Sequence, residues 1–561
     1  MLFRSISREL ATVAGQRSTS SLLVIHSPKP RAFFDDALPA AATLPFLMIQ
    51  SAPADNFLQA VGWQLPAVKR MVTHYLRAAV WIKERIELAD RYDLPICNLE
   101  QDIPIFLADL DFARRLTKAD ALLWWTSAAR PDLGGRQTDA NSHQLFEDLH
   151  NPEIGRPGCY SNACLEVDIR NLAADAVLQS ALVYELEGGE GGASIGFEAA
   201  SHTLDEYSKG TAHAAVSLGD AVLPTQTFNI VRSMVKAWSS EAAKPGGEHW
   251  RLMIDHFWRW ISSPTAKLYD PALYRFVHGL MRKTFSQLLA EFRRLGCEVV
   301  HADFGRVFLL TSKPSSASGY AYANYVVSSV TSRELFRYVQ LDIVRFWDQL
   351  VWMDTANYAG VICDRPDEIE VVDDLAEVEI EMHWNIASFL PPAVQDDFST
   401  VVARFVHGMH AAKRQSIDSV RTPLRLLQNG SGTAADPTKL DEVELARTCI
   451  SQLLTRQLLK LVSTLKERAS EADPKDPDFH FPDLPGTHLK STNVVLEFVK
   501  STCAVLALAK DVGAEVLVLK RNLLDLIGVR EFATEAAFRN PCLPFKVPMV
   551  VCRTCNIARG E

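Results

Sequence analysis

Two cysteines near the end of the sequence have the spacing of a metal-binding knuckle. Cys552 and Cys555 are separated by two residues and directly follow the apolar stretch Val547–Val551. A C-x-x-C pair presents two thiolates at the spacing that tetrahedral zinc sites use. Because a closed zinc site needs four ligands, the pair predicts half a site, with Cys542 as a candidate third ligand. The alternative is a redox pair of the thioredoxin type, which would lie between a strand and a helix.

Two aspartates occupy positions from which they could hold a divalent metal ion. Asp168 lies in the apolar segment Cys164–Leu172, and Asp303 lies at the predicted turn of a strand–turn–strand segment, Glu298–Leu310. Carboxylates on adjacent strands are the ligands with which nucleotidyl-transfer enzymes hold two Mg²⁺ ions. Taken alone, each aspartate is more simply explained as a turn or strand-end residue.

The other motifs in the sequence do not define an active site. The chain has no Walker loop, no dinucleotide fingerprint and no H-E-x-x-H pair. The segment 185–192, ELEGGEGG, is predicted to be a loop, and its acids would repel a phosphate. His407 and His410 could share a helix face, but no further ligand is close in sequence, so ordinary surface or core histidines are expected.

One predicted helix, 273–295, carries a group of basic residues that could contact DNA phosphates. A shorter basic pair follows at Lys413 and Arg414. Loss of DNA binding with salt would be the signature of such contacts. The simpler alternative is a solvated helix face. The basic residues of the helix are Arg282, Lys283, Arg293 and Arg294.

The elements that would position these residues are mostly helical. Apolar periodicity predicts strands at 22–25 and 163–169 and a strand pair across 298–310. Helical spacing predicts helices over the ranges 67–91, 102–116, 171–182, 228–238, 273–295, 320–330, 332–346, 398–412, 443–471 and 492–512. This mixture of strands and helices indicates an α/β (α+β) fold.

Composition limits the classes of protein to which this chain can belong. Its 561 residues are 48% hydrophobic, so it can bury sizeable cores and is not mainly disordered. The net charge of −10 argues against a nonspecific nucleic-acid binder but leaves room for a local basic groove. No stretch reaches the roughly 18 apolar residues that span a bilayer. The ten cysteines are mostly isolated, as is typical of thiols in a reducing compartment.

Two segments have unusual charge. Residues 1–20 are rich in Arg and Ser, which resembles a transit peptide, although a disordered leader is the simpler interpretation. Residues 364–381 contain nine acids and one base. Like charges repel, which favours a solvated loop there, with an exposed strand as the alternative.

Several long blocks resemble, in order, the C-terminal inactivated half of the catalytic subunits of the DNA polymerase epsilon family, which are B-family DNA polymerases. The blocks are 57–76, 102–116, 122–135, 164–180, 262–311, 346–361 and 383–392. The resemblance implies a degenerate B-family polymerase architecture with exonuclease-like, palm, fingers and thumb parts. The implied parts are a leader (1–20), an exonuclease-like domain (21–150), palm and fingers (151–390, with the acidic loop 364–381), a helical thumb (391–535) and the start of a zinc-binding tail (536–561).

The residues at the palm positions imply that catalysis is lost. Active members have D-x-x-S-L-Y-P-S in the first palm motif, where this chain keeps Asp168 and then has Asn171–Ala174. They have D-T-D in the third, where this chain has His301, Ala302 and Asp303. The resemblance therefore implies no catalytic residue, although Asp168 and Asp303 could still hold one ion.

The family relationship implies a scaffold rather than an enzyme. The expected partners are the other DNA polymerase epsilon subunits, the replicative helicase complex and possibly DNA, in the nucleus and without a membrane. The expected cofactor is zinc at the tail, on Cys552 and Cys555, while an iron–sulfur cluster is implied only for the longer parent protein. The alternatives are a DNA-holding module or residual nucleotidyl transfer.

Overall fold

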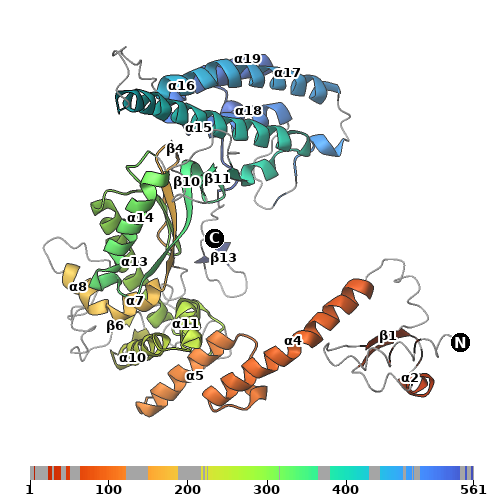
Figure 1. Ribbon diagram of the computed structural model, residues 1–561, viewed down its shortest axis with the longest axis vertical. Coiled ribbons are helices and arrows are strands. Elements are labelled where there is room, and N and C mark those ends of the chain that lie inside the picture. The colour runs from red at the N-terminus through yellow and green to blue at the C-terminus, as the bar shows by residue number, and fades with distance from the viewer. Residues whose placement is uncertain are drawn as a thin grey trace. The chain divides into compact units, whose positions relative to one another are not determined.

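The chain divides into two compact units, Met1–Phe106 and Leu107–Glu561. Figure 1 shows the computed structural model with its elements labelled. This division does not test the domain boundaries predicted at residues 150, 390 and 535, which stay predictions. The structure describes residues 6, 10, 23–27, 29, 31–38, 46–50, 64–121, 149–187, 216–218, 221–223, 225–314, 316–363, 379–428, 442–471, 476–482, 484, 493–543, 550–551 and 558–559.

Within its described residues, the first unit has a small strand pair and the helices α2 and α4. The predicted strand at 22–25 is confirmed as β1 (Leu23–Ser27), which pairs in parallel with β2 (Phe46–Gln50). Helix α2 (Arg31–Ala37) contributes Phe34 to a small core with Leu38, Leu23, Ile25 and Met48, and Ile6 and Leu10 from the predicted leader pack there too. The predicted helix at 67–91 is confirmed as α4 (Gln64–Arg91), followed by η3 (Ile96–Asn98).

A curled, mainly antiparallel sheet forms the centre of the second unit. Its strand order is β12-β11-β10-β5-β9-β8-β3, and β4 pairs with β10. The predicted strand at 163–169 is β5, and the predicted strand pair is the β8–β9 hairpin. The strands are β3 (Ile154–Gly155), β4 (Gly158–Tyr160), β5 (Cys164–Arg170), β8 (Glu298–Ala302), β9 (Arg306–Leu310), β10 (Gln340–Asp354), β11 (Asn357–Ile362) and β12 (Ile380–Trp384).

The prediction of a helix over 332–346 is wrong. Only Glu334–Phe336 is helical, as the short η4, and the chain then enters β10. The first half of β10 pairs with β5 and its second half with β11. The partner β5 lies more than 150 residues earlier in the sequence, whereas β11 follows β10 after a short turn. Long-range pairing of a segment rich in aromatic and β-branched residues therefore outweighs its local helical spacing.

Two helices pack against this sheet, and a side-chain cap fixes where one of them begins. Helix α14 contacts β10 and β5, and α13 contacts β8. Helix α13 begins at Pro271 because Asp270 caps it, accepting the amide of Ala272 at 2.8 Å. The described helices between residues 103 and 331 are α5 (Ile103–Lys118), α7 (Leu172–Leu178), α8 (Ser180–Glu187), α10 (Thr225–Ala242), α11 (Glu248–Asp255), α12 (Phe257–Ser262), α13 (Pro271–Arg294) and α14 (Ser316–Thr331).

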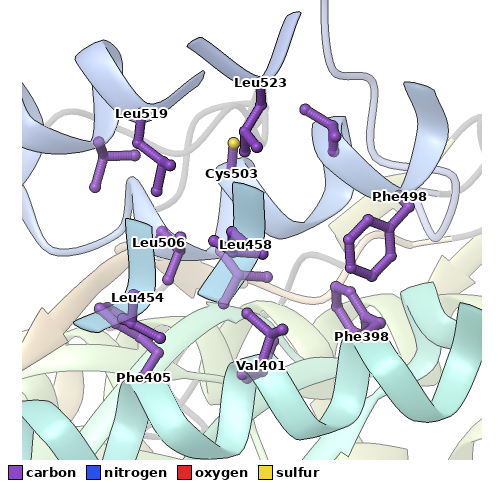
Figure 2. Packing of buried hydrophobic residues seen from close by; sticks show 14 of the residues in the cluster. Phe398, Val401, Phe405, Leu454, Leu458, Phe498, Cys503, Leu506, Leu519 and Leu523 are labelled. Atoms are coloured by element: carbon purple, nitrogen blue, oxygen red, sulfur yellow. The ribbon is translucent and has the colours of Figure 1, made fainter. Parts of the chain in front are cut away.

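A helical bundle with its own apolar core follows the sheet. Figure 2 shows Phe398, Phe405, Leu458 and Leu506 converging in this core. Helix α15 also contacts β11 and β12, which joins the bundle to the sheet. The bundle consists of α15 (Pro392–Gln428), α16 (Glu442–Thr448), the π-helical turn η6 (Cys449–Leu454), α17 (Thr455–Glu471), α18 (Val494–Leu506) and α19 (Gly513–Ile527).

Gly408 sets how closely α15 approaches η6. A Cβ atom built on Gly408 would overlap the sulfur of Cys449. We expect Gly408→Ala to lower the free energy of unfolding by about 1–3 kcal/mol, because overpacking displaces neighbouring side chains. Urea unfolding of the chain measures the effect. In Gly513→Ala the new methyl group meets nothing within 4 Å, so this control should be neutral or stabilising; an equal loss in both variants would contradict the packing argument.

The two loop predictions fail where the structure describes them. The predicted loop 185–192 is wrong for residues 185–187, which end helix α8 before the first glycine. The predicted loop 364–381 is wrong for Ile380 and Glu381, which begin β12 because β11 pairs with them. Residues 188–192 and 364–378 lie outside the described residues, as does the block 122–135. Among the helices that the structure describes, none is long and apolar enough to cross a membrane.

Candidate functional site

The sheet brings both predicted aspartates to one arginine. Asp168 lies on β5 directly opposite Arg306 of β9, and Asp303 lies in the β8–β9 turn. The Arg306 guanidinium contacts Asp168 (Nε to Oδ1, 3.2 Å), and the Arg306 amide donates to Asp303 Oδ1 at 2.8 Å. The two carboxylates, 39% and 41% exposed, therefore share a neighbour that already carries a positive charge.

The same arginine neutralises a third carboxylate, Glu166. Side chains alternate along a strand, so Glu166 faces the same side of the sheet as Asp168. Arg306 Nη1 lies 2.9 Å from Glu166 Oε1, and the indole of Trp347 donates to the other oxygen at 3.3 Å. Burial raises the pKa of Glu166 even though Arg306 opposes this shift. A divalent ion at this position would have to displace the guanidinium first.

Asp303 shapes the turn of the hairpin. Its Oδ1 accepts the amides of Gly305 at 2.7 Å and Arg306, and its Oδ2 lies 3.2 Å from the His301 ring. Burial acts to raise the Asp303 pKa, but these hydrogen bonds outweigh it and hold the pKa below its usual value. His301 is buried and its ring stacks on the Trp352 ring, with the ring centroids 5.0 Å apart. The turn-residue interpretation of Asp303 therefore has a direct structural basis.

A second group of charges continues along the same part of the sheet. Arg345 of β10 lies opposite Glu166 and forms an ion pair with Glu381 of β12. His383 Nε2 lies 2.6 Å from Glu381 Oε1. The His383 ring packs on the Tyr358 ring, with the ring centroids 4.7 Å apart. Sequence reasoning missed these residues because they come from three strands, one of them predicted as a helix. Glu166 could have been identified from the sequence, because it precedes Asp168 by two positions in a predicted strand and therefore lies on the same face.

The charges of this cluster sum to an acidic surface. Three arginines, Arg170, Arg306 and Arg345, stand against five carboxylates, a balance of −2. The carboxylates are Glu166, Asp168, Asp303, Asp342 and Glu381. Because Glu166 is buried, the excess at the surface itself is one acid, which still disfavours a phosphate backbone.

The described residues provide no complete metal site. No group of three or more His, Cys, Asp or Glu residues in the described part of the chain is arranged to hold a metal ion. Cys552 and Cys555 lie outside the described residues. The Cys542 sulfur lies 3.9 Å from Asn357 Oδ1, and burial raises its pKa, which disfavours the thiolate that zinc requires. Cys542 as a third ligand and zinc at the tail both stay predictions.

Only some of the residues predicted to contact DNA are exposed, and one of the exposed residues forms an ion pair. Arg282, Arg293 and Arg294 are exposed on α13, but Arg294 pairs with Glu291 at 2.8 Å. Lys283 of the same helix is half-buried. Lys413 is buried against Asp348, so the pair Lys413–Arg414 does not form a basic surface.

Comparison with known proteins assigns the chain to a family. Residues 1–361 match the family described as "Domain of unknown function (DUF1744)", and the chain belongs to this family. The chain is also homologous over its whole length to the catalytic subunit of DNA polymerase epsilon, which confirms the resemblance predicted from the sequence blocks.

Three fungal relatives are much longer than this chain. The Emericella nidulans subunit is 35% identical over 99% of the chain and 25% of its own length. The subunit of Saccharomyces cerevisiae is 32% identical and that of Schizosaccharomyces pombe 30%, each over 99% of the chain and 24% of its own length. The chain thus spans about a quarter of the curated relatives that it matches.

Similarity to solved structures is weak. A family B DNA polymerase from Pyrobaculum calidifontis matches with a TM-score of 0.33 and 13% identity, over 66% of this chain and 39% of that one. The mixed α/β class is confirmed by the elements themselves. The finer division into exonuclease-like, palm, fingers and thumb parts stays a prediction.

Proposed function

We propose that this chain is part of the catalytic subunit of a DNA polymerase epsilon, in which it serves DNA replication in the nucleus as a non-catalytic segment. Homology to that subunit over the whole chain supports the membership. The observation that carries the non-catalytic role is the position of Arg306, which neutralises Asp168 and Glu166. Phosphoryl transfer needs metal ions at such carboxylates, and a resident guanidinium opposes their binding.

The role proposed first for the segment is to bind proteins. The acidic cluster around Arg306 and Arg345 fits a polypeptide partner, and the expected partners are the other polymerase epsilon subunits and the replicative helicase complex. Zinc on Cys552 and Cys555 belongs to this proposal as a feature of the tail.

Primer extension tests the proposal. We expect the purified chain to extend no primer on a DNA template with either Mg²⁺ or Mn²⁺. The matched control is the double variant Asp168→Asn, Asp303→Asn. Extension by the native chain that the double variant abolishes would refute the non-catalytic role, whereas equal extension by both would reveal a contaminating polymerase.

A second candidate function is DNA holding by helices α10–α13. Residues 225–294 carry eleven Lys and Arg against five Asp and Glu, a balance of +6 in a chain of net charge −10. Such a concentration of positive charge is typical of a phosphate-binding surface. Arg293 and Arg294 lie at the end of α13 and are exposed.

We expect the double variant Arg293→Ala, Arg294→Ala to weaken duplex DNA binding and to reduce its dependence on salt, by about one unit of slope for each phosphate that is no longer neutralised. Fluorescence anisotropy at several salt concentrations measures this slope. Arg521→Ala, an exposed arginine of α19 paired with Glu531, is the control and should leave the slope unchanged. Identical slopes in all three proteins would remove the DNA-holding function.

A further inference from the structure

Helix α4 exposes its side chains along most of its length. Between residues 66 and 88, no side chain is buried. The helix is anchored at its C-terminal end, where Ala89 and Tyr92 are buried and the Leu94 amide donates to the Ala89 carbonyl at 2.9 Å. Seven large apolar side chains are exposed: Met71, Tyr75, Leu76, Val80, Trp81, Ile82 and Ile86. Helices in water owe most of their stability to packing of an apolar face, so α4 needs a partner.

The apolar residues form a seam with coiled-coil spacing. Val68, Met71, Tyr75, Ala79, Ile82 and Ile86 follow one another at intervals of three and four residues. This spacing places them on one side of the helix, and it is the spacing at which two helices interlock their side chains. Three exposed apolar residues lie off this seam: Leu76, Val80 and Trp81. The Arg85 guanidinium covers one face of the Trp81 ring, with its carbon 4.6 Å from the ring centroid.

The charge of α4 selects the kind of helix that can pair with it. Residues 64–83 contain four Lys and Arg and no acid, and the whole helix carries six bases against three acids. A second copy of α4 would bring like charges together, which opposes self-association. Acidic residues flanking an apolar stripe would instead complement the basic half of α4.

We propose that the seam of α4 binds an amphipathic helix with acidic flanks, supplied by the part of the catalytic subunit outside these 561 residues. The inference rests on the proposed function, under which about three quarters of the subunit lies outside this chain, as it does in the relatives. The seam would then be an internal interface of the complete subunit.

Hydroxyl-radical footprinting tests the inference on the 561-residue chain and on the full-length subunit. Sulfur and aromatic side chains react fastest, so Met71 and Tyr75 report on the seam and Trp81 reports on the opposite region of the helix. We expect Met71 and Tyr75 to be oxidised in the chain alone and protected several-fold in the full-length subunit, with Trp81 labelled in both.

A pair of matched variants makes the test specific to the seam. In the full-length subunit, Ile82→Glu with Ile86→Glu should remove the protection of Met71 and Tyr75. Val80→Glu, which adds a charge off the seam, should retain it. Protection already present in the chain alone would place the partner within the chain, and no protection in either protein would mean that the seam stays open; either result overturns the inference.

A separate experiment distinguishes failure of the inference about the seam from failure of the proposed function. An immunoblot of native extract with an antibody against residues 262–311 reports the size of the native polypeptide independently of α4. A band several times larger than the 62.4 kDa chain supports membership in the longer subunit, whatever the footprint shows. A band at the size of the chain itself would refute both the membership and the source proposed for the partner helix.

Discussion

Replacing Asp348 with alanine is expected to lower the free energy of unfolding by about 3–5 kcal/mol, because it leaves a buried lysine without its counter-charge. Lys413 and His410 of α15 are each only 2% exposed, and both contact Asp348 of β10. The distances to the Asp348 carboxylate are 3.2 Å from Lys413 Nζ and 2.8 Å from His410 Nε2. Lys413 also donates to the Asp348 carbonyl, so the cluster joins the helical bundle to the sheet. Urea unfolding monitored by circular dichroism measures the loss.

The double variant Asp348→Leu, Lys413→Met separates the cost of an orphaned charge from the value of the ion pair itself. Removing both charges leaves no uncompensated ion, so we expect the double variant to recover much of the stability that Asp348→Ala loses. Arg521→Ala breaks an exposed ion pair with Glu531 and should leave the unfolding midpoint nearly unchanged. If Asp348→Ala were as mild as Arg521→Ala, the buried cluster would not be the contact that holds bundle and sheet together.

The sequence was sufficient to predict most of the helices and the strand pairs with local turns. The helices at 67–91 and 273–295 have long apolar periods, and Asp270 with Pro271 marks the start of the second. The β8–β9 hairpin joins two apolar runs through a short turn at Asp303. These features depend on neighbours close in the sequence, which is the information that a periodic pattern carries.

The long strand β10 could not be predicted in the same way. Its partner β5 lies more than 150 residues earlier in the sequence, and its ladder runs from Gln340 opposite Arg170 to Trp347 opposite Cys164. Apolar side chains at irregular spacing fit either a helix or a strand that is buried on both faces. The pairing decides between them, and a local pattern contains no information about it.

The candidate site was predictable only in part for the same reason. The residue types and flanking strands of Asp168 and Asp303 predict metal ligands, and the sheet does place the two aspartates near each other. The residue that decides their chemistry, Arg306, lies three positions after Asp303 and looks like an ordinary strand residue in the sequence. Its role appears only when the strand register sets it opposite Asp168 and within 2.9 Å of Glu166.

Asp175 leads to the second large expected effect, a stability that depends on pH. The Asp175 carboxyl on α7 is fully buried, and its Oδ1 accepts the amide of Tyr338 at 2.9 Å. Its Oδ2 makes no hydrogen bond within the described part of the chain. Burial raises the Asp175 pKa from 3.8 to about 8, against the opposing effect of the Tyr338 amide. The folded chain therefore holds Asp175 as a neutral acid at pH 7.

The sign of the pH dependence follows from proton binding. Between pH 3.8 and about 8 the folded state keeps a proton on Asp175 that the unfolded state has lost. The free energy of unfolding therefore falls as pH rises through this window, by at most about 1.4 kcal/mol per pH unit, and this contribution is flat above it. Asp175→Asn is close in shape to the neutral acid and can still accept the Tyr338 amide, but it has no proton to lose.

We expect Asp175→Asn to gain stability over the native chain progressively from pH 5 to pH 8. Urea midpoints of both proteins at each pH measure this difference, which isolates Asp175 from the other buried carboxyls that titrate in both proteins. Asp511→Asn changes an exposed carboxyl and should give a difference that stays constant with pH. If the difference for Asp175→Asn were also constant, the carboxyl would be ionised in the folded chain and would need a cationic or water partner near Oδ2. A protonated Asp175 agrees with its place on the buried helix α7, where no cation among the described residues acts on its pKa.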